Sequence, residues 1–373
     1  MSNILGSSID FSLFGESHGP GVGFVLSGLP AGLPVDVSYI EEALRRRRGI
    51  DAVSTGRREK DSYSFLSGVK EDTTKGGFRT TGTPLTAVIE NADQKSEDYE
   101  ALEDLPRPGH ADFTADVRYH GYQDKRGGGA FSGRLTAPVV MAGAMVRRVL
   151  EDKGILIASH IAQLGPLKDD AFPEKESSRA LLSRLAKSDF PLIREGSRSD
   201  FLDLLSRAKA DKDSWGGRLE TQVMGLSPGY GSLFFDRLDA RLAYAVMTIP
   251  GVKGVTFGAG MDLASMTGSQ ANDPMVMTTD GPGFESNRAG GIQGGISTGM
   301  PILFQTVVKP TPSIGKPQRT VNLRTGREED LVIRGRHDPA IVHRAFEVVN
   351  AMTALVLFDI ILAQDGPSSL ICH

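Results

Sequence analysis

The sequence predicts an α+β protein folded as one large domain. Predicted strands and helices mix along the 373 residues without strict β-α alternation, which disfavours a doubly wound parallel sheet. The 44 glycines and 20 prolines imply many tight turns between short elements. Hydrophobic residues make up 39 % of the chain, which is enough for a buried core. We expect the domain to cover residues 1–373, with a helical insertion or covering layer at 167–213 and a tail at 364–373.

Strands are predicted where short apolar runs are bounded by turn residues. These runs are residues 22–27, 62–69, 84–90, 155–164, 219–224, 254–257 and 302–308.

Helices follow from apolar spacing and from residues that cap helix ends. The clearest helix is 138–153, where small and apolar residues recur at helical spacing and Gly154 stands just beyond the end. Asp36 or Ser38 is expected to cap a helix that ends near Arg48. Further helices are predicted around 180–185 and 201–208, and over 236–247 and 340–362.

Composition excludes several classes of protein. The net charge is −4 with acids and bases mixed throughout, so nucleic acid is not an expected partner. Cys372 is the only cysteine, which leaves no disulfide framework and no cysteine metal site, and no metal is expected. The N-terminus lacks a signal pattern and no run of about 18 apolar residues appears, so we expect a cytoplasmic protein with no membrane partner.

Residues 107–134 contain two histidines, four arginines and a triple glycine, with almost no periodic apolar face. Such a segment is suited to holding a polyanion and moving a proton. Three other segments share this character: GESHGPGVG from Gly15, the arginines at 45–48, and RGRHDP from Arg334. Together they indicate an enzyme that acts on a phosphorylated, carboxylated small molecule.

His18 and His110 each lie in a loop where an imidazole could donate or accept a proton near neutral pH. The alternative is a turn in which the ring only satisfies backbone groups. For one isolated histidine that alternative is the better reading, but two such loops favour function.

The anion-binding candidates have structural alternatives. The arginines at 45–48 could compensate a helix dipole, although four in a row exceed that need and repel one another unless an anion binds. Arg57 and Arg58 are expected to be solvated charges. Gly127, Gly128 and Gly129, just before a helix, could cradle a phosphate. The glycines of 290–299 and the segment 309–313 could bind phosphate or have only a structural role. Asp338 followed by Pro339 has the pattern of a helix start.

In the order of the chain, GESHG, RRR, RPGHAD, RGGG…SGR, GGIQGGISTG, KPTPSI and RHDP resemble the chorismate synthase family over roughly residues 6–360. The resemblance implies a sandwich of antiparallel sheets and helices, a homotetramer, and dependence on reduced FMN. It implies elimination of phosphate from 5-enolpyruvylshikimate 3-phosphate to give chorismate, with no net redox change.

The resemblance also assigns roles to residues of this chain. His18, His110 and Asp338 match catalytic positions: the acid near the leaving phosphate, the histidine that protonates the flavin, and the carboxylate near its N5. Substrate-binding positions are matched by Arg46, Arg47, Arg48, Arg107, Ser132 and Arg134. Flavin-binding positions are matched by Ala130, Phe131, Ser132, Pro250, Gly251, Gly294, Lys309, Pro310, Thr311, Pro312, Ser313 and Arg336.

The chain departs from the family pattern at three places. Residues 130–136 read AFSGRLT where many members read RSSARET, Pro250-Gly251 replaces a common Asn-Ala pair, and RRGIDA replaces RRPGxS. The histidines and Asp338 are kept, so we interpret the chain as a divergent branch with intact catalytic groups.

Two rival functions are weaker. A non-catalytic flavin- or phosphometabolite-binding protein would fit the altered 130–133 segment, and a phosphotransferase would use the glycine loops for a nucleotide but lacks a P-loop lysine. Some members of the family reduce their own flavin with NADPH. No additional reductase domain is visible here, which favours the monofunctional type.

Overall fold

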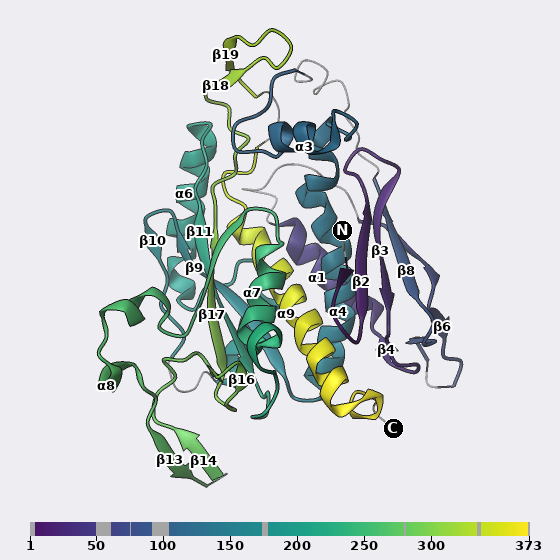
Figure 1. Ribbon diagram of the computed structural model, residues 1–373, viewed down its shortest axis with the longest axis vertical. Coiled ribbons are helices and arrows are strands. Elements are labelled where there is room, and N and C mark those ends of the chain that lie inside the picture. The colour runs from purple at the N-terminus through teal and green to yellow at the C-terminus, as the bar shows by residue number, and fades with distance from the viewer. Residues whose placement is uncertain are drawn as a thin grey trace.

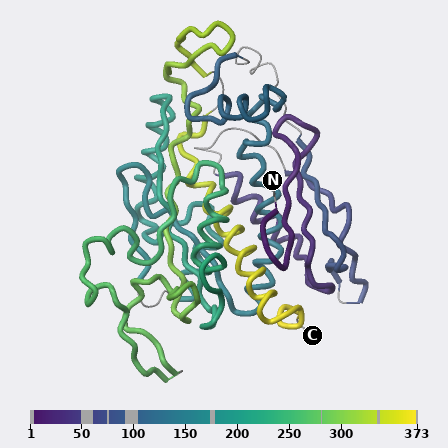
Figure 2. Tube along the Cα trace, viewed as in Figure 1, coloured from purple at the N-terminus to yellow at the C-terminus, as the bar shows by residue number. Residues whose placement is uncertain are grey.

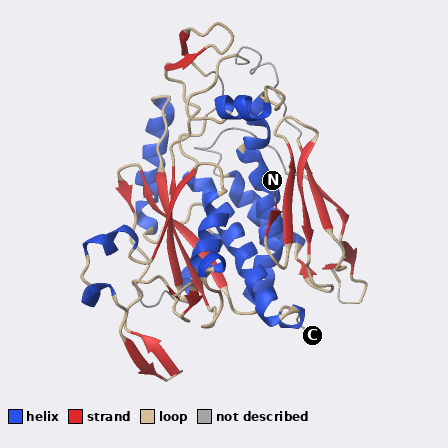
Figure 3. Cartoon of the chain, viewed as in Figure 1, coloured by secondary structure: helices blue, strands red, loops and turns tan. Residues whose placement is uncertain are grey.

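A computed structural model describes residues 4–49, 61–74, 76–91, 104–173, 178–279, 281–333 and 337–371. Long helices form a layer between two antiparallel sheets, and a further helix packs on the outer face of the second sheet (Figures 1 and 3). The α+β class is thereby confirmed, and the layer order is sheet, helices, sheet.

The first sheet has the strand order β1-β2-β3-β8-β5, with all neighbours antiparallel. Its strands are β1 (Ile4–Leu5), β2 (Asp10–Gly15), β3 (Gly21–Ser27), β8 (Leu85–Glu90) and β5 (Tyr63–Ser67). Val22, Phe24 and Leu26 alternate along β3 and are fully buried on the helix side. A small sheet adjoins it, formed by β4 (Pro34–Val35), β7 (Phe78–Thr80) and β6 (Val69–Glu71).

The second sheet has the strand order β10-β9-β11-β17-β12 and is also antiparallel. Its strands are β10 (Leu167–Lys168), β9 (Leu156–Leu164), β11 (Gly217–Met224), β17 (Ile302–Val308) and β12 (Val252–Phe257). Helices pack on both faces of β9, which explains why this strand is almost continuously buried.

Three short hairpins complete the strands. They are β13 (Met275–Thr278) with β14 (Gly281–Phe284), β15 (Ile292–Gln293) with β16 (Ile296–Ser297), and β18 (Gln318–Val321) with β19 (Glu328–Leu331). The first projects from the lower end of the molecule and the last lies at the upper end (Figures 1 and 2).

The helices between the sheets are α1 (Val37–Arg48), α4 (Thr136–Asp152), α7 (Leu238–Met247) and α9 (Val342–Asp365). Of the two caps that the sequence allows, Asp36 and Ser38, it is the Asp36 side chain that caps α1, accepting from the Tyr39 amide at 3.0 Å. Helix α4 packs closely on α9: a Cβ at Gly143 would come 2.4 Å from the Ala351 Cβ, so this approach requires glycine.

Helix α9 is long and apolar enough to cross a membrane, but its most apolar 18-residue window is entirely buried within the protein. Polar residues such as Asn350 and Asp359 interrupt it and bond to other elements. It is therefore a core helix.

Two helices lie within the predicted covering layer, α5 (Arg179–Lys187) and α6 (Arg198–Ala210), and α5 packs on β9. Below it, His160 of β9 lies between two carboxylates, with Nδ1 3.1 Å from Asp169 and Nε2 3.0 Å from Glu220. Burial alone would lower the pKa of His160, but the hydrogen bonds to Asp169 and Glu220 raise it. Through these two ion pairs, His160 connects Asp169, at the beginning of the covering layer, to the second sheet.

The remaining helices among the described residues are short. They are α3 (Asp112–Tyr119), α8 (Gly268–Ala271) and the 3₁₀ turns η1 (Arg126–Phe131), η2 (Gly133–Leu135), η3 (Glu195–Ser197), η4 (Phe234–Asp236), η5 (Gly260–Ser265) and η6 (Pro367–Ser369).

Most predicted elements are confirmed, with ends displaced by a few residues. The predicted strand 62–69 is instead divided into β5 and β6 at Gly68. Gly68 has φ +80°, and a Cβ there would lie 2.3 Å from the Leu85 Cα, so the chain bends where only glycine fits.

Asp359 of α9 holds the N-terminal segment. Its carboxylate accepts from the amides of Ser8 and Ile9, both at 2.7 Å, and from the amide and hydroxyl of Ser7, and it pairs with Arg241. Burial would raise the pKa of Asp359, but these donors keep it below its ordinary value.

We expect Asp359→Ala to lower the free energy of unfolding by about 3–5 kcal/mol, because it leaves Arg241 and three amides without an acceptor. Urea denaturation at pH 7 measures this. Since the folded pKa is depressed, the contribution of Asp359 is present above pH 4 and lost as pH falls through the folded pKa. Glu328→Gln, at the exposed pair with Arg319, serves as a control and should change stability by less than about 1 kcal/mol. Equal losses in both variants would contradict the role of Asp359.

Candidate active site

His18 lies in the turn between β2 and β3 and is only 3 % exposed. Its Nδ1 is 3.2 Å from the Ser17 hydroxyl, which donates to the Arg126 carbonyl. Because the hydroxyl proton is engaged with that carbonyl, its oxygen is free to accept a proton from Nδ1. This arrangement favours the tautomer that carries a hydrogen on Nδ1.

The triple glycine lies directly against His18. Gly127, Gly128 and Gly129 have φ values of 58°, 85° and 51°. A Cβ on Gly127 would lie 2.3 Å from the His18 Nδ1, and one on Gly129 would lie 2.2 Å from the Asp124 carbonyl oxygen. The left-handed backbone and the close approach both require glycine.

Arg107 lies at the same loop, within 3.8 Å of the position of a Cβ on Gly128. Its guanidinium forms a two-pronged pair with Asp112, at 2.7 and 2.8 Å. The pair fixes the guanidinium beside the glycines, so the predicted acid, the glycine loop and one predicted substrate arginine share a site.

Arg47 and Arg134 meet at a single buried carboxylate, Asp61. The Arg47 Nη2 is 3.2 Å from Asp61, and Arg134 pairs with the same group. Burial would raise the pKa of Asp61, but the two guanidinium groups keep it below its ordinary value. The two guanidinium groups thus lie side by side on Asp61, an arrangement of cations that suits an anion.

The arginine run 45–48 does not form one anion site. Successive helical residues point about 100° apart. Arg45 pairs on the surface with Glu42 and Asp189, whereas Arg46 enters the core. Arg47 pairs with Asp61 at the predicted site, and Arg48 is half-buried at the helix end.

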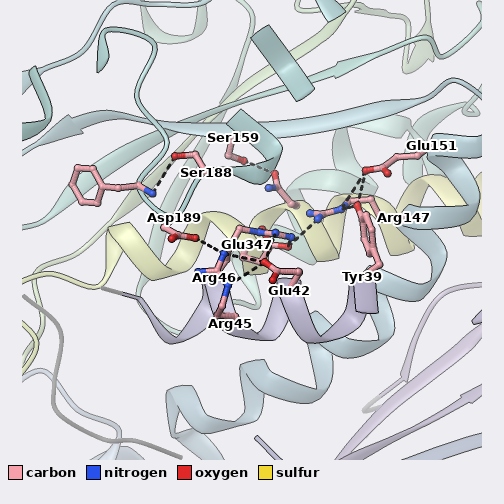
Figure 4. Close-up of polar contacts among 12 residues, drawn as sticks. Tyr39, Glu42, Arg45, Arg46, Arg147, Glu151, Ser159, Ser188, Asp189 and Glu347 are labelled. Atoms are coloured by element: carbon pink, nitrogen blue, oxygen red, sulfur yellow. Dashed lines mark hydrogen bonds and ion pairs between the residues drawn. The ribbon is translucent and has the colours of Figure 1, made fainter. Parts of the chain in front are cut away.

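Arg46 shares the buried Glu347 of α9 with Arg147 of α4 (Figure 4). The distances to the Glu347 carboxylate are 3.3 Å from Arg46 and 3.0 Å from Arg147. Arg147 also donates to the Tyr39 hydroxyl and stacks over that ring at 5.1 Å. The structure thus places Arg46, predicted to bind substrate, within the helix layer, where its charge joins α1, α4 and α9.

His110 lies at a second group of loops. Its Nε2 is 2.7 Å from the Ser313 hydroxyl, and Lys309 donates to the Gly109 carbonyl at 2.5 Å. Burial, with repulsion from Arg107 and Lys309, lowers the pKa of His110 to about 4. The imidazole is neutral at pH 7 in the ligand-free protein.

Asp338 does not cap the last helix. Helix α9 begins at Val342, with Ile341 at the cap position, so the predicted start at Asp338-Pro339 is wrong. The carboxylate instead accepts from Arg344 at 2.7 Å, and Arg344 donates to the Arg47 carbonyl at 3.2 Å. Asp338 is thereby tied to the Arg47–Asp61–Arg134 cluster.

The residues predicted to bind flavin are placed unevenly. Ala130 and Phe131 are exposed, and Ser132 accepts from the Arg134 amide at 3.3 Å. Pro250 and Gly251 adjoin the 309–313 segment, where the Lys309 amide donates to the Gly251 carbonyl at 2.9 Å. In that segment Pro310 is exposed, Pro312 packs against Gly109, and the buried Thr311 hydroxyl has no partner among the described residues.

Gly294 is not brought to these residues. It is exposed in the β15–β16 turn, whose neighbour Gly295 accepts from the first residue of α7, whereas Gly251 follows the last turn of that helix. The length of α7, about 15 Å at 1.5 Å per residue, separates the two. Arg336, Arg57 and Arg58 lie outside the described residues.

Several polar residues of the site were not predicted from the sequence. Asp61, Asn91, Asp112 and Arg344 each fix a predicted residue by side-chain bonds. Single carboxylates, amides and arginines occur throughout the chain, so only proximity distinguishes these. The one sequence signal was Asp112, which lies within RPGHAD.

Buried histidines, paired arginines and a strained glycine loop at adjoining ends of helices and strands define an enzyme that binds a small polyanion. Residues 9–362 match the sequence pattern of the family described as chorismate synthase. Chorismate synthase of Thermococcus kodakarensis is 42 % identical over 96 % of this chain and 97 % of its own, and that of Chloroflexus aggregans is 42 % identical over 97 % and 96 %.

A solved structure titled "Crystal Structure of Chorismate Synthase" superposes with a TM-score of 0.74 at 29 % identity, covering 96 % of this chain and 93 % of that one. The chain belongs to the chorismate synthase family. It is a carbon–oxygen lyase of aromatic amino-acid biosynthesis, with chorismate synthase activity.

The electrostatics of His110 generate one prediction. In the ligand-free protein its pKa is about 4, and a bound anion should raise it by offsetting Arg107 and Lys309. NMR titration of ¹³C-labelled histidines, with and without saturating FMN, measures the change. Lys309→Ala should raise the pKa of His110 without any ligand, because it removes a repulsive charge. The His160 signal, beneath the covering layer, is the internal control. A His110 pKa that FMN leaves at about 4 would contradict the proximity of an anion.

The position of Arg46 generates another. Arg46→Gln should cost about 3–5 kcal/mol of stability, since Glu347 loses one of its two buried partners. The kcat/KM of the folded variant should stay within about threefold of wild type, as expected of a residue outside the reacting site. Denaturation and steady-state kinetics provide the two measurements. Arg45→Gln, an exposed neighbour, is the matched control, with an expected cost below about 1 kcal/mol. A selective rise in KM for Arg46→Gln would restore it as a substrate ligand.

Proposed function

We propose that the whole chain acts as one catalytic domain that converts 5-enolpyruvylshikimate 3-phosphate to chorismate and inorganic phosphate, with reduced FMN as cofactor. The observation that carries this proposal is the meeting of His18, the Gly127–Gly129 loop and Arg107. That arrangement combines a proton donor with anion-binding groups, as the departure of a phosphate requires.

The substrate carries two carboxylates and a phosphate, so several arginines are needed to offset its charge. Arg47, Arg107 and Arg134 are held rigidly by Asp61 and Asp112, and Arg48 and Ser132 lie at the ends of the same elements. In the proposed reaction the C3–O bond to phosphate and the C6–H bond both break, and a second ring double bond forms. His18 donates a proton to the leaving phosphate.

The 309–313 segment, with His110 and Asp338, fits a flavin phosphate and ring. Lys309 supplies a cation, and the buried Thr311 hydroxyl lacks a described partner, as a group that awaits a ligand would. When bound, reduced FMN would lend electron density to the substrate and take up its C6 proton, leaving no net redox change. His110 would hold a proton beside the flavin, and Asp338 would stabilise positive charge near N5.

The separation of Gly294 from Gly251 and the 309–313 segment fits a homotetramer in which copies share flavin contacts. Exposed apolar side chains, among them Phe234 at 80 %, Phe235 at 95 % and Met277 at 80 %, are suited to burial between subunits. Light scattering should then give about four times 40.0 kDa. We also propose a cytoplasmic location and no built-in NADPH-dependent flavin reductase.

The test is anaerobic formation of chorismate from 5-enolpyruvylshikimate 3-phosphate with dithionite-reduced FMN. His18→Ala and His110→Ala should each lower kcat by about 10²–10⁴-fold, the usual contribution of a general acid. His120→Asn is the control: this exposed residue has φ +56°, which asparagine tolerates. Turnover should require dithionite and fail with NADPH and oxidised FMN. Tight FMN binding without phosphate release would instead support the non-catalytic alternative.

A further inference from the structure

Three carbonyl groups of the turn that holds His18 accept hydrogen bonds from one residue, Asn91. Asn91 Nδ2 donates to the carbonyls of Glu16 at 2.9 Å and Gly19 at 2.8 Å, and the Asn91 amide donates to Pro20 at 3.2 Å. Asn91 directly follows β8, which pairs with β3 at Gly21. The turn that holds His18 is therefore anchored to the end of the neighbouring strand.

The opposite end of the same amide faces the arginine cluster. Asn91 Oδ1 accepts from the Arg134 Nε at 2.9 Å, and Arg134 also donates to the Glu90 carbonyl at 2.9 Å. The orientation of the amide is fixed, because its oxygen faces a donor and its nitrogen faces two acceptors. If Oδ1 and Nδ2 of Asn91 exchanged places, the oxygen would face two carbonyl acceptors and the nitrogen would face the Arg134 donor.

On one side of the His18 turn, the hydrogen bonds from Asn91 face a cavity and not packed side chains. Pro20, Gly21 and Asn91 border an open cavity of about 580 Å³, also lined by Phe14, Val88 and Glu90. On the other side of the turn, Gly127 lies against the His18 ring and the Ser17 hydroxyl donates to the Arg126 carbonyl. Along the cavity, the bonds of Asn91 set the distance between the turn and Arg134.

We propose that Asn91 is a positioning residue that ties the His18 turn to Arg134, so that the proton donor and the anion-binding arginine keep a fixed separation. The connection continues through Asp61 to Arg47. Substrate bound by the arginines is thereby presented to His18 at a constant distance. This inference rests on the proposed role of His18 as the acid.

Asn91→Asp isolates the essential bonds. The aspartate keeps an acceptor for Arg134 but cannot donate to Glu16 and Gly19, so the turn should move away from it. We expect kcat to fall by about 10–10²-fold with little change in KM, the scale reported for small misplacements of reacting groups. Asn91→Ala should lose at least as much.

Thr80→Val is the matched control. Thr80 is 3 % exposed and makes two comparable bonds to a loop, accepting from the Leu33 amide at 2.9 Å and donating to the Pro30 carbonyl at 2.6 Å. That loop follows β3, whereas the His18 turn precedes it, so the two lie at opposite ends of the strand. The control should lose stability but keep wild-type kcat.

A double-mutant cycle with His18→Ala separates positioning from general damage. If Asn91 acts through His18, Asn91→Asp should cost less than about twofold once His18 is removed. Equal fold-losses with and without His18, or wild-type kcat in Asn91→Asp, would overturn the proposal.

Hydrogen exchange in the ligand-free protein gives a readout independent of turnover. The amides of residues 16–19 should exchange faster in Asn91→Asp and at the wild-type rate in Thr80→Val. Unchanged exchange in Asn91→Asp would also overturn the proposal. If His18→Ala retains wild-type turnover, the proposed acid is wrong, and the exchange rates still decide whether Asn91 positions the turn.

Discussion

The close contact of α4 with α9 at Gly143 and Ala351 is the constraint on which the site depends. It places the two helices side by side, and the segments that precede them carry the 126–135 loop and Asp338. The C-terminal end of α1 reaches the same region, since Arg47 contacts Thr136 at the start of α4. Two helix beginnings and the arginines of a third helix end are thus brought together, an arrangement suited to anions.

Carboxylates of the protein determine which arginines remain for a ligand. Glu347 engages Arg46 and Arg147 within the helix layer, and Asp189 and Glu42 engage Arg45 at the surface. Arg46 also reaches Glu42 at 3.8 Å and Arg147 also reaches Glu151 at 3.9 Å, so these two arginines serve to join the helices. Near the glycine loop, Asp61 pairs with both Arg47 and Arg134.

The two predicted acids lie in different electrical surroundings. His18 is enclosed by glycine backbone and oriented by Ser17, in a turn anchored by Asn91. His110 is buried beside Arg107 and Lys309, and burial together with their positive charges lowers its pKa to about 4. One imidazole is oriented by its neighbours and the other has a lowered pKa, which suits two proton transfers with different partners.

The sequence by itself determined the family, the α+β class, most strands and helices, and the loops that carry His18, His110 and the glycines. Those features are local: apolar spacing, caps and short motifs lie within a few residues of one another. The tertiary structure alone decided which partners Arg46, Asp61, Asn91 and Asp338 contact. Four consecutive arginines on a helix point in different directions, and only the packing of α1 on α4 and α9 decides which meets a carboxylate. The partners are as much as 301 residues apart in sequence, a separation at which no local pattern specifies contact.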